Sequence, residues 1–356
     1  MRKLTGDVVI AGLGLAGSLL SLRLAERGFK VTAFEPVESS YVKPCGEQLT
    51  LEELPLRLAK AYDVIKTIVN FVHVFVEGKY ITTTNMSGNS RWAIIDKPRL
   101  IMSLRRSALD NGVDIIRRPW NGERGALTID SRGPYNLPLS SEVLALRVIA
   151  KVPAWSSEEA ILDFRPSLGG LYWVFPYDDS GHLINVGAGF VGLYDAVHLE
   201  GLVRGYIKEK ISQNFDVLEV KGAPINVFTN PSLSTGDIIN VGEAAGLVMA
   251  WSGEGNRPSI VSAEALAGAI SSYGIEDRTS ILKKYSEGIS SLLSSAVLSR
   301  LLTRASYRSP LAEGLLRNMP KWAWDLYVRQ EFGLDDFLRA APQAIASMLA
   351  RREDKR

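Results

Sequence analysis

The sequence predicts an α/β fold from three observations: a βαβ unit opens the chain, antiparallel hairpin patterns follow it, and helical spacing dominates the C-terminal part. The βαβ unit is typical of a Rossmann-like domain, whereas the hairpins are typical of an antiparallel sheet. Because the two patterns alternate, we expect the chain to cross between two domains more than once. We divide it into a Rossmann-like domain (1–70, 96–134 and 235–275), an antiparallel-sheet domain (71–95 and 135–234) and a C-terminal helical region (276–356).

The first 35 residues carry the βαβ pattern. A buried strand is predicted from Val8 to Ala11, an apolar-striped helix ends at Glu26 before the stop signal Gly28, and a second strand runs from Lys30 to Glu35. The turn between the first strand and the helix is glycine-rich, Gly12-Leu-Gly-Leu-Ala-Gly17. Strand, turn, helix and second strand thus follow in the order of a dinucleotide-binding fingerprint.

Each residue type in this fingerprint has a physical role. Gly12 permits a tight turn, Gly14 removes a side chain so that a pyrophosphate can approach backbone N–H groups, and Gly17 lets helix and strand pack closely. We place Ala16 among the cofactor-binding residues as well. Glu35, 18 residues beyond Gly17, can accept hydrogen bonds from ribose hydroxyls, and its charge disfavours the 2′-phosphate of NADP.

The middle of the chain reads as strands interrupted by one helix. The stretch 71–84 predicts a hairpin around Glu-Gly-Lys, because β-branched and aromatic residues flank that turn. A helix over 98–111 and a strand over 113–116 are expected to return to the Rossmann-like domain. Further short strands are predicted at 142–151, 171–175 and 183–188.

A second nucleotide-binding element begins near residue 236. The segment Asn240-Val-Gly242-Glu243-Ala-Ala-Gly246 resembles the strand-turn motif, usually Gly-Asp, with which flavoproteins of the glutathione-reductase-like class hold the ribityl chain. Glu243 stands where aspartate is usual. Farther on, Gly253, Gly255 and Asn256 precede a helix whose backbone N–H groups could stabilise the negative charge of a reduced flavin. We therefore predict FAD as the cofactor of the Rossmann-like domain.

Three further segments indicate which class of flavoprotein the sequence resembles. They are Lys43-Pro-Cys-Gly-Glu47, Gly169-Gly-Leu-Tyr-Trp-Val-Phe-Pro176 and Asn185-Val-Gly187. Read with the two flavin motifs, they resemble the geranylgeranyl reductase family, within the larger group of flavin-dependent aromatic hydroxylases. The resemblance spans roughly residues 7 to 270 and implies a glutathione-reductase-like FAD fold.

The resemblance also assigns residues. In the family, a Pro-Cys-Gly segment lies at the flavin, which implies that Cys45 and Gly46 contact the cofactor, and Arg99 matches an arginine that reaches it. The family's Asp-Gly segment appears here only as Arg132-Gly133, without its aspartate. A Tyr-x-Trp-x-Phe-Pro segment lines the isoprenoid pocket, and Leu171 stands in place of its tyrosine. The residues that match this segment are Trp173, Phe175 and Pro176.

The activity that the resemblance implies is reduction of isolated double bonds in a prenyl chain by hydride from the flavin, with NAD(P)H or ferredoxin as electron donor. An isolated alkene also needs a proton donor. Cys45 is one candidate, and it is equally compatible with a cofactor contact or with a small buried apolar residue. Trp173 and Phe175 alternate on one face of a strand, so core packing is their alternative role.

Three other functions stay open from the sequence. An FAD-dependent monooxygenase or hydroxylase of an apolar substrate would share both flavin motifs and consume O₂. A lipid or flavin carrier without turnover is the second, and the altered acid at Glu243 favours it if cofactor occupancy proves low. An NAD-dependent dehydrogenase gives no role to residues 242–257.

Composition limits the partners. Forty-one Lys and Arg against 39 Asp and Glu leave a formal charge of +2, which gives no broad electrostatic footprint for nucleic acid. One cysteine precludes an intrachain disulfide, the three scattered histidines predict no metal site, and no apolar run reaches spanning length. We expect a cytoplasmic protein, with peripheral membrane contact as an option.

The C-terminal helices carry the aromatic residues Trp322, Trp324 and Tyr327. These helices would cap a hydrophobic tunnel, lie on a membrane or pack against the rest of the protein without a further role.

Overall fold

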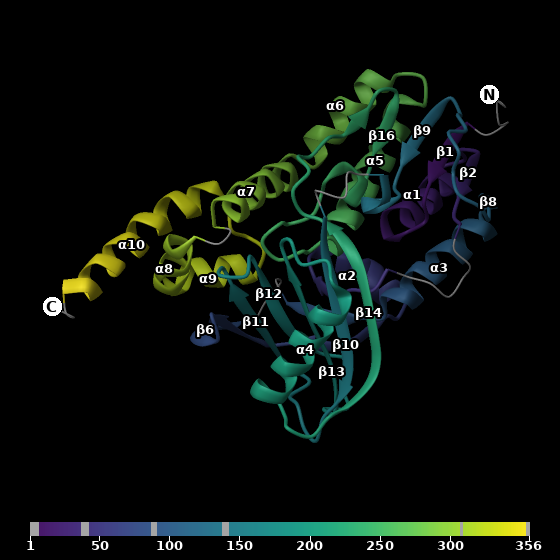
Figure 1. Cartoon of the computed structure of the whole chain (residues 1–356). Helices are drawn as coiled ribbons and strands as arrows, with labels where there is room; N and C mark the ends of the chain where they lie inside the picture. The colour runs from purple at the N-terminus through teal and green to yellow at the C-terminus, as the bar shows by residue number, and fades with distance from the viewer. Residues whose placement is uncertain (1–6, 37–42, 87–90, 137–141, 307–308, 354–356) are drawn as a thin grey trace.

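The computed structural model describes residues 7–36, 43–86, 91–136, 142–306 and 309–353. A parallel sheet with its helices occupies one end of the molecule, a large and mostly antiparallel sheet occupies the other, and the C-terminal helices run outward between them (Figure 1). The predicted α/β class with a Rossmann-like part, an antiparallel sheet and a helical C-terminal region is confirmed.

The parallel sheet draws strands from all three stretches that the sequence assigns to the Rossmann-like domain. Its central strand, β1 (Val8–Ala11), pairs in parallel with β2 (Val31–Phe34) on one side and with β9 (Leu127–Asp130) on the other. Beyond them lie β8 (Asp114–Ile116), β16 (Ile238–Asn240) and an antiparallel edge strand, β15 (Ser234–Thr235). Because the strand order reverses at β1, a crevice for ligands is expected at the carboxyl ends of β1 and β9.

Helices cover this sheet because its strands are apolar on both faces. Every residue of β1, β2 and β9 is buried. Helix α1 (Leu15–Glu26) packs against both α3 (Lys97–Asp110) and α5 (Asn256–Tyr273). Two segments far apart in sequence therefore hold the helix that follows the glycine-rich turn.

The large sheet has the strand order β14-β10-β13-β12-β11-β5-β6. Its pairs are antiparallel except for β11 with β5, which is parallel. The predicted hairpin is confirmed, with its turn at Glu77 and Gly78, both at positive φ. Helix α4 (Ala196–Lys210) contacts β10 and β13. The strands are β5 (Phe71–Val76), β6 (Lys79–Asn85), β10 (Glu142–Lys151), β11 (Glu159–Arg165), β12 (Gly170–Pro176), β13 (Leu183–Phe190) and β14 (Asp216–Asn226).

A third, three-stranded sheet joins the two parts, and the sequence analysis did not predict it. Its central strand β7 (Trp92–Ile95) pairs with β3 (Gln48–Thr50) and β4 (Ile65–Val69). Helix α2 (Glu53–Ala61) lies between β3 and β4 along the chain. The sheet positions residues 43–47, which precede β3, beside the other two sheets.

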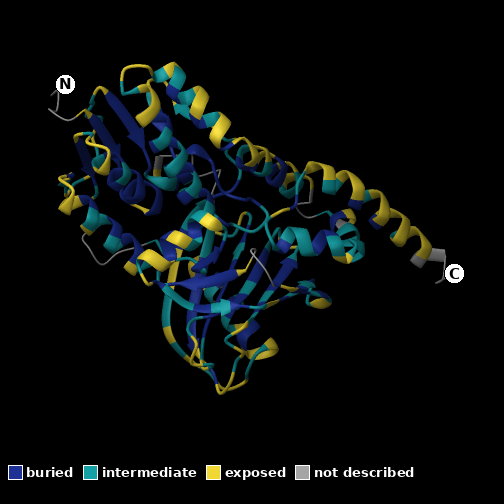
Figure 2. Ribbon diagram, turned by 180° about the vertical axis from the view of Figure 1, so that it is seen from behind, coloured by how far each residue is buried: buried dark blue, intermediate teal, exposed yellow. Residues whose placement is uncertain are grey.

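The C-terminal region is helical, as predicted: α6 (Arg278–Gly288), α7 (Ser290–Ser306), α8 (Pro310–Asn318), α9 (Lys321–Val328) and α10 (Leu334–Glu353). Trp324 on α9 is buried against Phe164 of β11, so α9 seals the end of the large sheet. In contrast, α10 is exposed along much of its length (Figure 2). Among the described helices, none is both long and apolar enough to span a bilayer.

Candidate functional site

A cavity of about 780 Å³ lies where the parallel sheet meets the other two sheets. On one side, the residues that follow the carboxyl ends of four parallel strands line it: Gly12 after β1, Glu35 after β2, Ser131 after β9 and Val241 after β16. On the other side it is lined by β10 and β12 of the large sheet and by residues 43–48. The cavity therefore occupies the crevice expected where the strand order reverses.

The glycine-rich turn has the geometry that the sequence predicts. Gly12 has a φ of +89°, a conformation that side chains rarely adopt. A Cβ on Gly17 would lie 2.0 Å from the Gly12 carbonyl oxygen, whereas a Cβ on Gly14 would meet no atom within 4 Å. Gly14 faces open space in the cavity and also begins α1, which no described side chain caps. The backbone N–H groups at this helix start are therefore available to an anion.

Glu35, at the end of β2, is held by the glycine turn and by an arginine of α3. Its Oε2 accepts hydrogen bonds from the Leu13 backbone N–H at 2.7 Å and from the Arg105 guanidinium at 3.1 Å. Arg105 also donates to the Leu13 carbonyl oxygen from Nε at 2.8 Å. Burial lowers the pKa of Arg105 although Glu35 acts to raise it. Both side chains line the cavity and connect the glycine turn to α3.

Arg105 of α3 lines this cavity, whereas the predicted Arg99 does not. Arg99 lies on the surface, where its guanidinium faces Asp63 at 3.3 Å, and it does not line the cavity. The two arginines are six positions apart on α3, so they point to different sides of the helix. Arg105 lies four residues after the buried Ile101, and this spacing was the available sequence signal for it.

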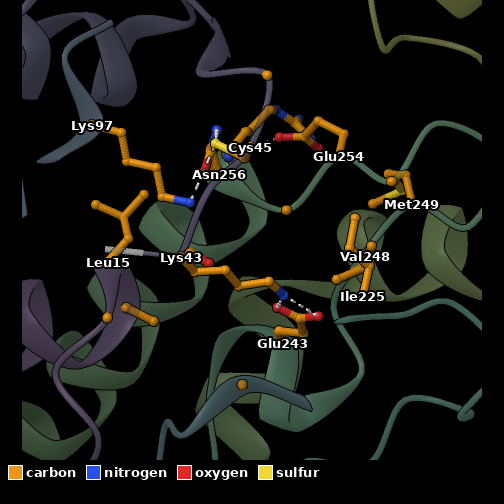
Figure 3. Close-up of a pocket in the computed structure, with 18 of the residues that line it drawn as sticks. Leu15, Lys43, Cys45, Lys97, Ile225, Glu243, Val248, Met249, Glu254 and Asn256 are labelled. Carbon is orange, nitrogen blue, oxygen red and sulfur yellow. Dashed lines mark hydrogen bonds and ion pairs between the residues drawn. The ribbon is translucent and has the colours of Figure 1, made fainter. Parts of the chain in front are cut away.

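Glu243 lies in the predicted flavin motif and forms an ion pair across the site. Its Oε2 lies 2.7 Å from Nζ of Lys43 (Figure 3). Its Oε1 accepts from the Asn226 backbone N–H at 2.9 Å. Gly242 has a φ of +63°, and a Cβ there would lie 2.9 Å from the Ala16 Cβ. The two predicted nucleotide-binding elements therefore pack against each other, and Ala16 and Glu243 line one cavity.

Arg132 stands where the resemblance predicts an aspartate. Its guanidinium pairs with Asp130 at 2.6 Å and lies 4.8 Å from the centre of the Trp120 ring. Arg132, Gly133 and Trp120 all line the cavity beside the glycine turn. This part of the wall therefore carries a cation stacked on an aromatic ring, which the sequence analysis did not anticipate.

Cys45 and Gly46 form the wall opposite the glycine turn. The Cys45 sulfur accepts from the Glu47 backbone N–H at 3.2 Å, from Lys97 Nζ at 3.4 Å and from Asn256 Nδ2 at 3.9 Å. A Cβ on Gly46 would lie 2.6 Å from the Phe175 ring, so only glycine lets this segment rest on β12. Cys45 is thus a free thiol surrounded by N–H donors at the cavity wall.

A buried ion network behind Cys45 was not predicted. Glu47 has a φ of +60° and is buried, with Oε1 2.6 Å from Arg147 and Oε2 2.9 Å from Lys66. Burial acts to lower the pKa of Arg147, but Glu47 and Glu219 together raise it. Arg147 also donates to the Cys45 carbonyl oxygen at 3.0 Å. The network therefore fixes the Cys45 segment to β10.

Gly253, Gly255 and Glu254 of the loop before α5 line the cavity, together with Asn256, the first residue of α5. Glu254 is 8% exposed, and its Oε1 accepts from the Arg257 backbone N–H at 2.8 Å. Burial raises the pKa of its carboxyl group to about 7. No motif in the sequence marks Glu254 as a functional residue.

A second, apolar cavity of about 310 Å³ adjoins the first. It lies between the large sheet and helices α7 to α9, and none of the described residues that line it is charged. Of the predicted substrate residues, Trp173 lines both cavities, Phe175 lines the larger one, and Pro176 lines neither. The residues common to both cavities include Leu171, Trp173, Ile225, Trp251, Tyr327 and Phe332.

Several solved structures share this architecture over nearly the whole chain. A geranylgeranyl bacteriochlorophyll reductase-like protein from Thermoplasma acidophilum superposes with a TM-score of 0.77 at 16% identity and covers 98% of both chains. The fold is that of the FAD-dependent oxidoreductases. The resemblance inferred from the sequence is thus confirmed as a resemblance of fold.

Other structures with this fold carry different activities. The flavin-dependent brominase Bmp2 gives a TM-score of 0.66 at 14% identity, with 98% of each chain covered. The probable FAD-dependent monooxygenase pqsL from Pseudomonas aeruginosa gives 0.63 at 16% identity, with 86% of this chain and 98% of that chain covered. No protein-family model and no curated protein matches the sequence.

Proposed function

We propose that this chain binds FAD in the larger cavity and reduces carbon–carbon double bonds in a prenyl chain, such as a geranylgeranyl group carried by a lipid or a diphosphate. One observation carries the proposal: the cavity lined by the glycine turn and Glu243 adjoins a second cavity whose lining, over the described residues, carries no charged side chain. A polar cofactor and an apolar chain would thus meet at the residues that both cavities share.

The residues of the larger cavity fit FAD. Open space at Gly14 and the uncapped start of α1 would receive the pyrophosphate, and Glu35 would bind ribose hydroxyls. Glu243 would accept from the ribityl chain while Lys43 stays beside it. The loop at 253–256, together with Cys45 and Gly46, would enclose the flavin ring. When bound, the flavin supplies a hydride and accepts electrons from a donor such as NAD(P)H or ferredoxin.

The smaller cavity fits an isoprenoid better than a compact polar substrate. Its walls are mostly aliphatic and aromatic side chains, which bind methyl-branched chains through burial of apolar surface. Trp173 is held by a hydrogen bond from Nε1 to the Asn185 side-chain oxygen at 3.1 Å. This fixed indole, present in both cavities, would set the position of the double bond relative to the cofactor.

Exposed leucines near this cavity support an entrance for lipid substrates. Leu311 on α8 lines the apolar cavity and is nevertheless 58% exposed. Along α10, Leu334, Leu338, Ile345 and Leu349 are exposed as well. We propose a cytoplasmic enzyme whose α8 and α10 touch a membrane when it takes up its substrate.

Anaerobic reoxidation separates this activity from the main alternative. The FAD-loaded protein would be reduced with dithionite and mixed with geranylgeranyl diphosphate or a geranylgeranyl lipid in the absence of oxygen. The proposal predicts return of oxidised flavin and a product heavier by two hydrogens for each double bond reduced. Reoxidation by O₂ only, with an oxygenated product, would favour the FAD-dependent monooxygenase that the structural neighbours also suggest.

A further inference from the structure

Glu254 is a buried carboxyl group at the cavity that has only one of its oxygens engaged. Oε1 accepts the Arg257 backbone N–H, whereas Oε2 is buried without a hydrogen-bond partner among the described residues. An ionised carboxylate is costly in such a position. A protonated carboxyl group fits it better, because it can keep the bond through Oε1 and leaves no charge on the unpaired Oε2.

The charges around Glu254 do not neutralise it. The Arg257 guanidinium is directed to Glu52, with Nε and Oε1 2.9 Å apart. Burial raises the pKa of Glu254, Arg257 opposes this rise, and Glu52 adds to it. The other ionisable groups that line the cavity on neighbouring elements include Lys97, which donates to Cys45, and Glu331 after α9. Glu254 therefore remains able to hold a proton near neutral pH.

Glu254 also stands close to where the two cavities meet. Ser252 and Gly253, the residues just before it, line both cavities. In Figure 3, its carboxyl group lies on the side of the pocket that carries Cys45 and Asn256, away from the pair of Lys43 and Glu243.

Cys45, the other candidate donor, is placed less well. Three N–H groups are directed at its sulfur, including the Lys97 ammonium at 3.4 Å. These contacts suit a sulfur that accepts hydrogen bonds, whereas proton delivery needs a group whose own hydrogen is directed to the substrate.

We propose that Glu254 is the proton donor of this site and transfers its carboxyl proton to one carbon of the alkene. The role rests on the proposed function. As the carboxyl O–H bond and the alkene π bond break, two C–H bonds form: one with the Glu254 proton and one with the hydride of the reduced flavin. The alkene is reduced, the flavin is oxidised, and the carboxylate regains its proton from water. The proton and the hydride thus account for both added hydrogens.

The variants Glu254→Gln and Glu254→Asp test this role against a merely structural one. Glutamine keeps the acceptor for the Arg257 N–H but has no acidic proton, whereas aspartate keeps the acid. Glu254→Gln is expected to bind FAD and to be reduced by dithionite like the wild type, but to slow anaerobic reoxidation by the geranylgeranyl substrate by about 100-fold or more. Glu254→Asp is expected to recover most of this rate. The matched control, Glu53→Gln, alters an exposed carboxylate on α2.

Two further measurements report on the protonation of Glu254. The wild-type reoxidation rate should fall as the pH rises above neutrality, and Glu254→Gln should lose this dependence. In the flavin-free protein, infrared difference spectra should show the C=O band of a protonated carboxylic acid at neutral pH, and this band should be missing in Glu254→Gln. This second readout does not depend on turnover.

The outcomes separate the two proposals. Equal reoxidation rates in wild type and Glu254→Gln, or no infrared band assignable to Glu254, would overturn the role of Glu254 and leave the prenyl reductase intact. A wild-type protein that binds FAD but is never reoxidised by a prenyl alkene would overturn the proposed function, and the proton transfer with it.

Discussion

The two adjoining cavities of this molecule are built in opposite ways. The larger one is made from backbone groups and charges at strand ends, such as the turn at Gly14 and the carboxylates of Glu35 and Glu243. The smaller one is made from apolar side chains contributed by the large sheet and by helices α7 to α9. A few local positions thus control the first, whereas many interchangeable contacts shape the second.

The largest effect on the cofactor cavity is expected for Gly14→Val. The valine side chain would fill the space at the start of α1, so FAD affinity should fall by about 1000-fold or more. Titration of the apoprotein with FAD, followed by flavin fluorescence, measures the loss. Gly201→Val, at an exposed position on α4, serves as the control and should bind FAD normally. Retained affinity in Gly14→Val would show that the turn does not hold the cofactor.

A second test uses the one buried acid in the loop before α5. Burial raises the pKa of Glu254 from its ordinary 4.5 to about 7. Between these values the unfolded chain releases a proton that the folded protein keeps, so the stability of the wild type falls as the pH rises through this window. Glu254→Gln cannot ionise and should be more stable than the wild type at about pH 8, by on the order of 3 kcal/mol.

Urea unfolding at about pH 8 and about pH 4 measures this difference. At the lower pH both forms of residue 254 are neutral, so the two free energies of unfolding should coincide. A difference that persists unchanged at low pH would assign the effect to packing and not to ionisation.

Trp173→Ala tests the contribution of the apolar cavity to substrate binding. The indole lines both cavities, so its loss should raise KM for a prenyl substrate by about 10- to 100-fold through lost apolar contact. FAD affinity should stay within about 3-fold of the wild type, because the nucleotide turn is untouched. Steady-state kinetics and an FAD titration check the two halves. An equal loss in both would mean that the cavities are not separate in function.

The smallest effect is expected for Cys45→Ser. A serine hydroxyl can accept the same N–H groups that surround the sulfur, so the loop should keep its position and FAD should stay bound. Turnover is expected to fall by less than about 10-fold if the thiol is not the acid. A loss of about 100-fold with normal FAD content would instead return the role of proton donor to Cys45.

The same contrast explains what the sequence could predict. Gly12, Gly14, Gly17 and Glu35 occupy the turn and strand end that the sequence predicts, because their positions depend on one local βαβ unit, whose geometry follows from short-range spacing. Their role in binding a cofactor stays a prediction. Glu243 was singled out from an equally local strand-turn pattern and lines the same cavity, and its role at a flavin stays a prediction. These local signals also sufficed for the α/β class and for the hairpin at Glu77 and Gly78.

Features that depend on distant contacts were missed. Arg105 replaces Arg99 at the cavity because packing of α3 decides which helix face points inward. The network of Glu47, Arg147 and Lys66 includes a pair, Glu47 and Arg147, that is 100 residues apart, and the sheet around β7 pairs strands that no local pattern links. The apolar cavity likewise arises only when helices α7 to α9 fold over the sheet.

The most direct test of the central claim is the visible absorbance spectrum of the purified protein, with chromatography of the material that heat releases from it. The account predicts a yellow protein that releases FAD, or a colourless one that becomes yellow when FAD is added. A colourless protein that takes up no added FAD would contradict it. The pair of Lys43 and Glu243 would then close the site to the cofactor, and a carrier that shields a lipid without turnover would become the better account.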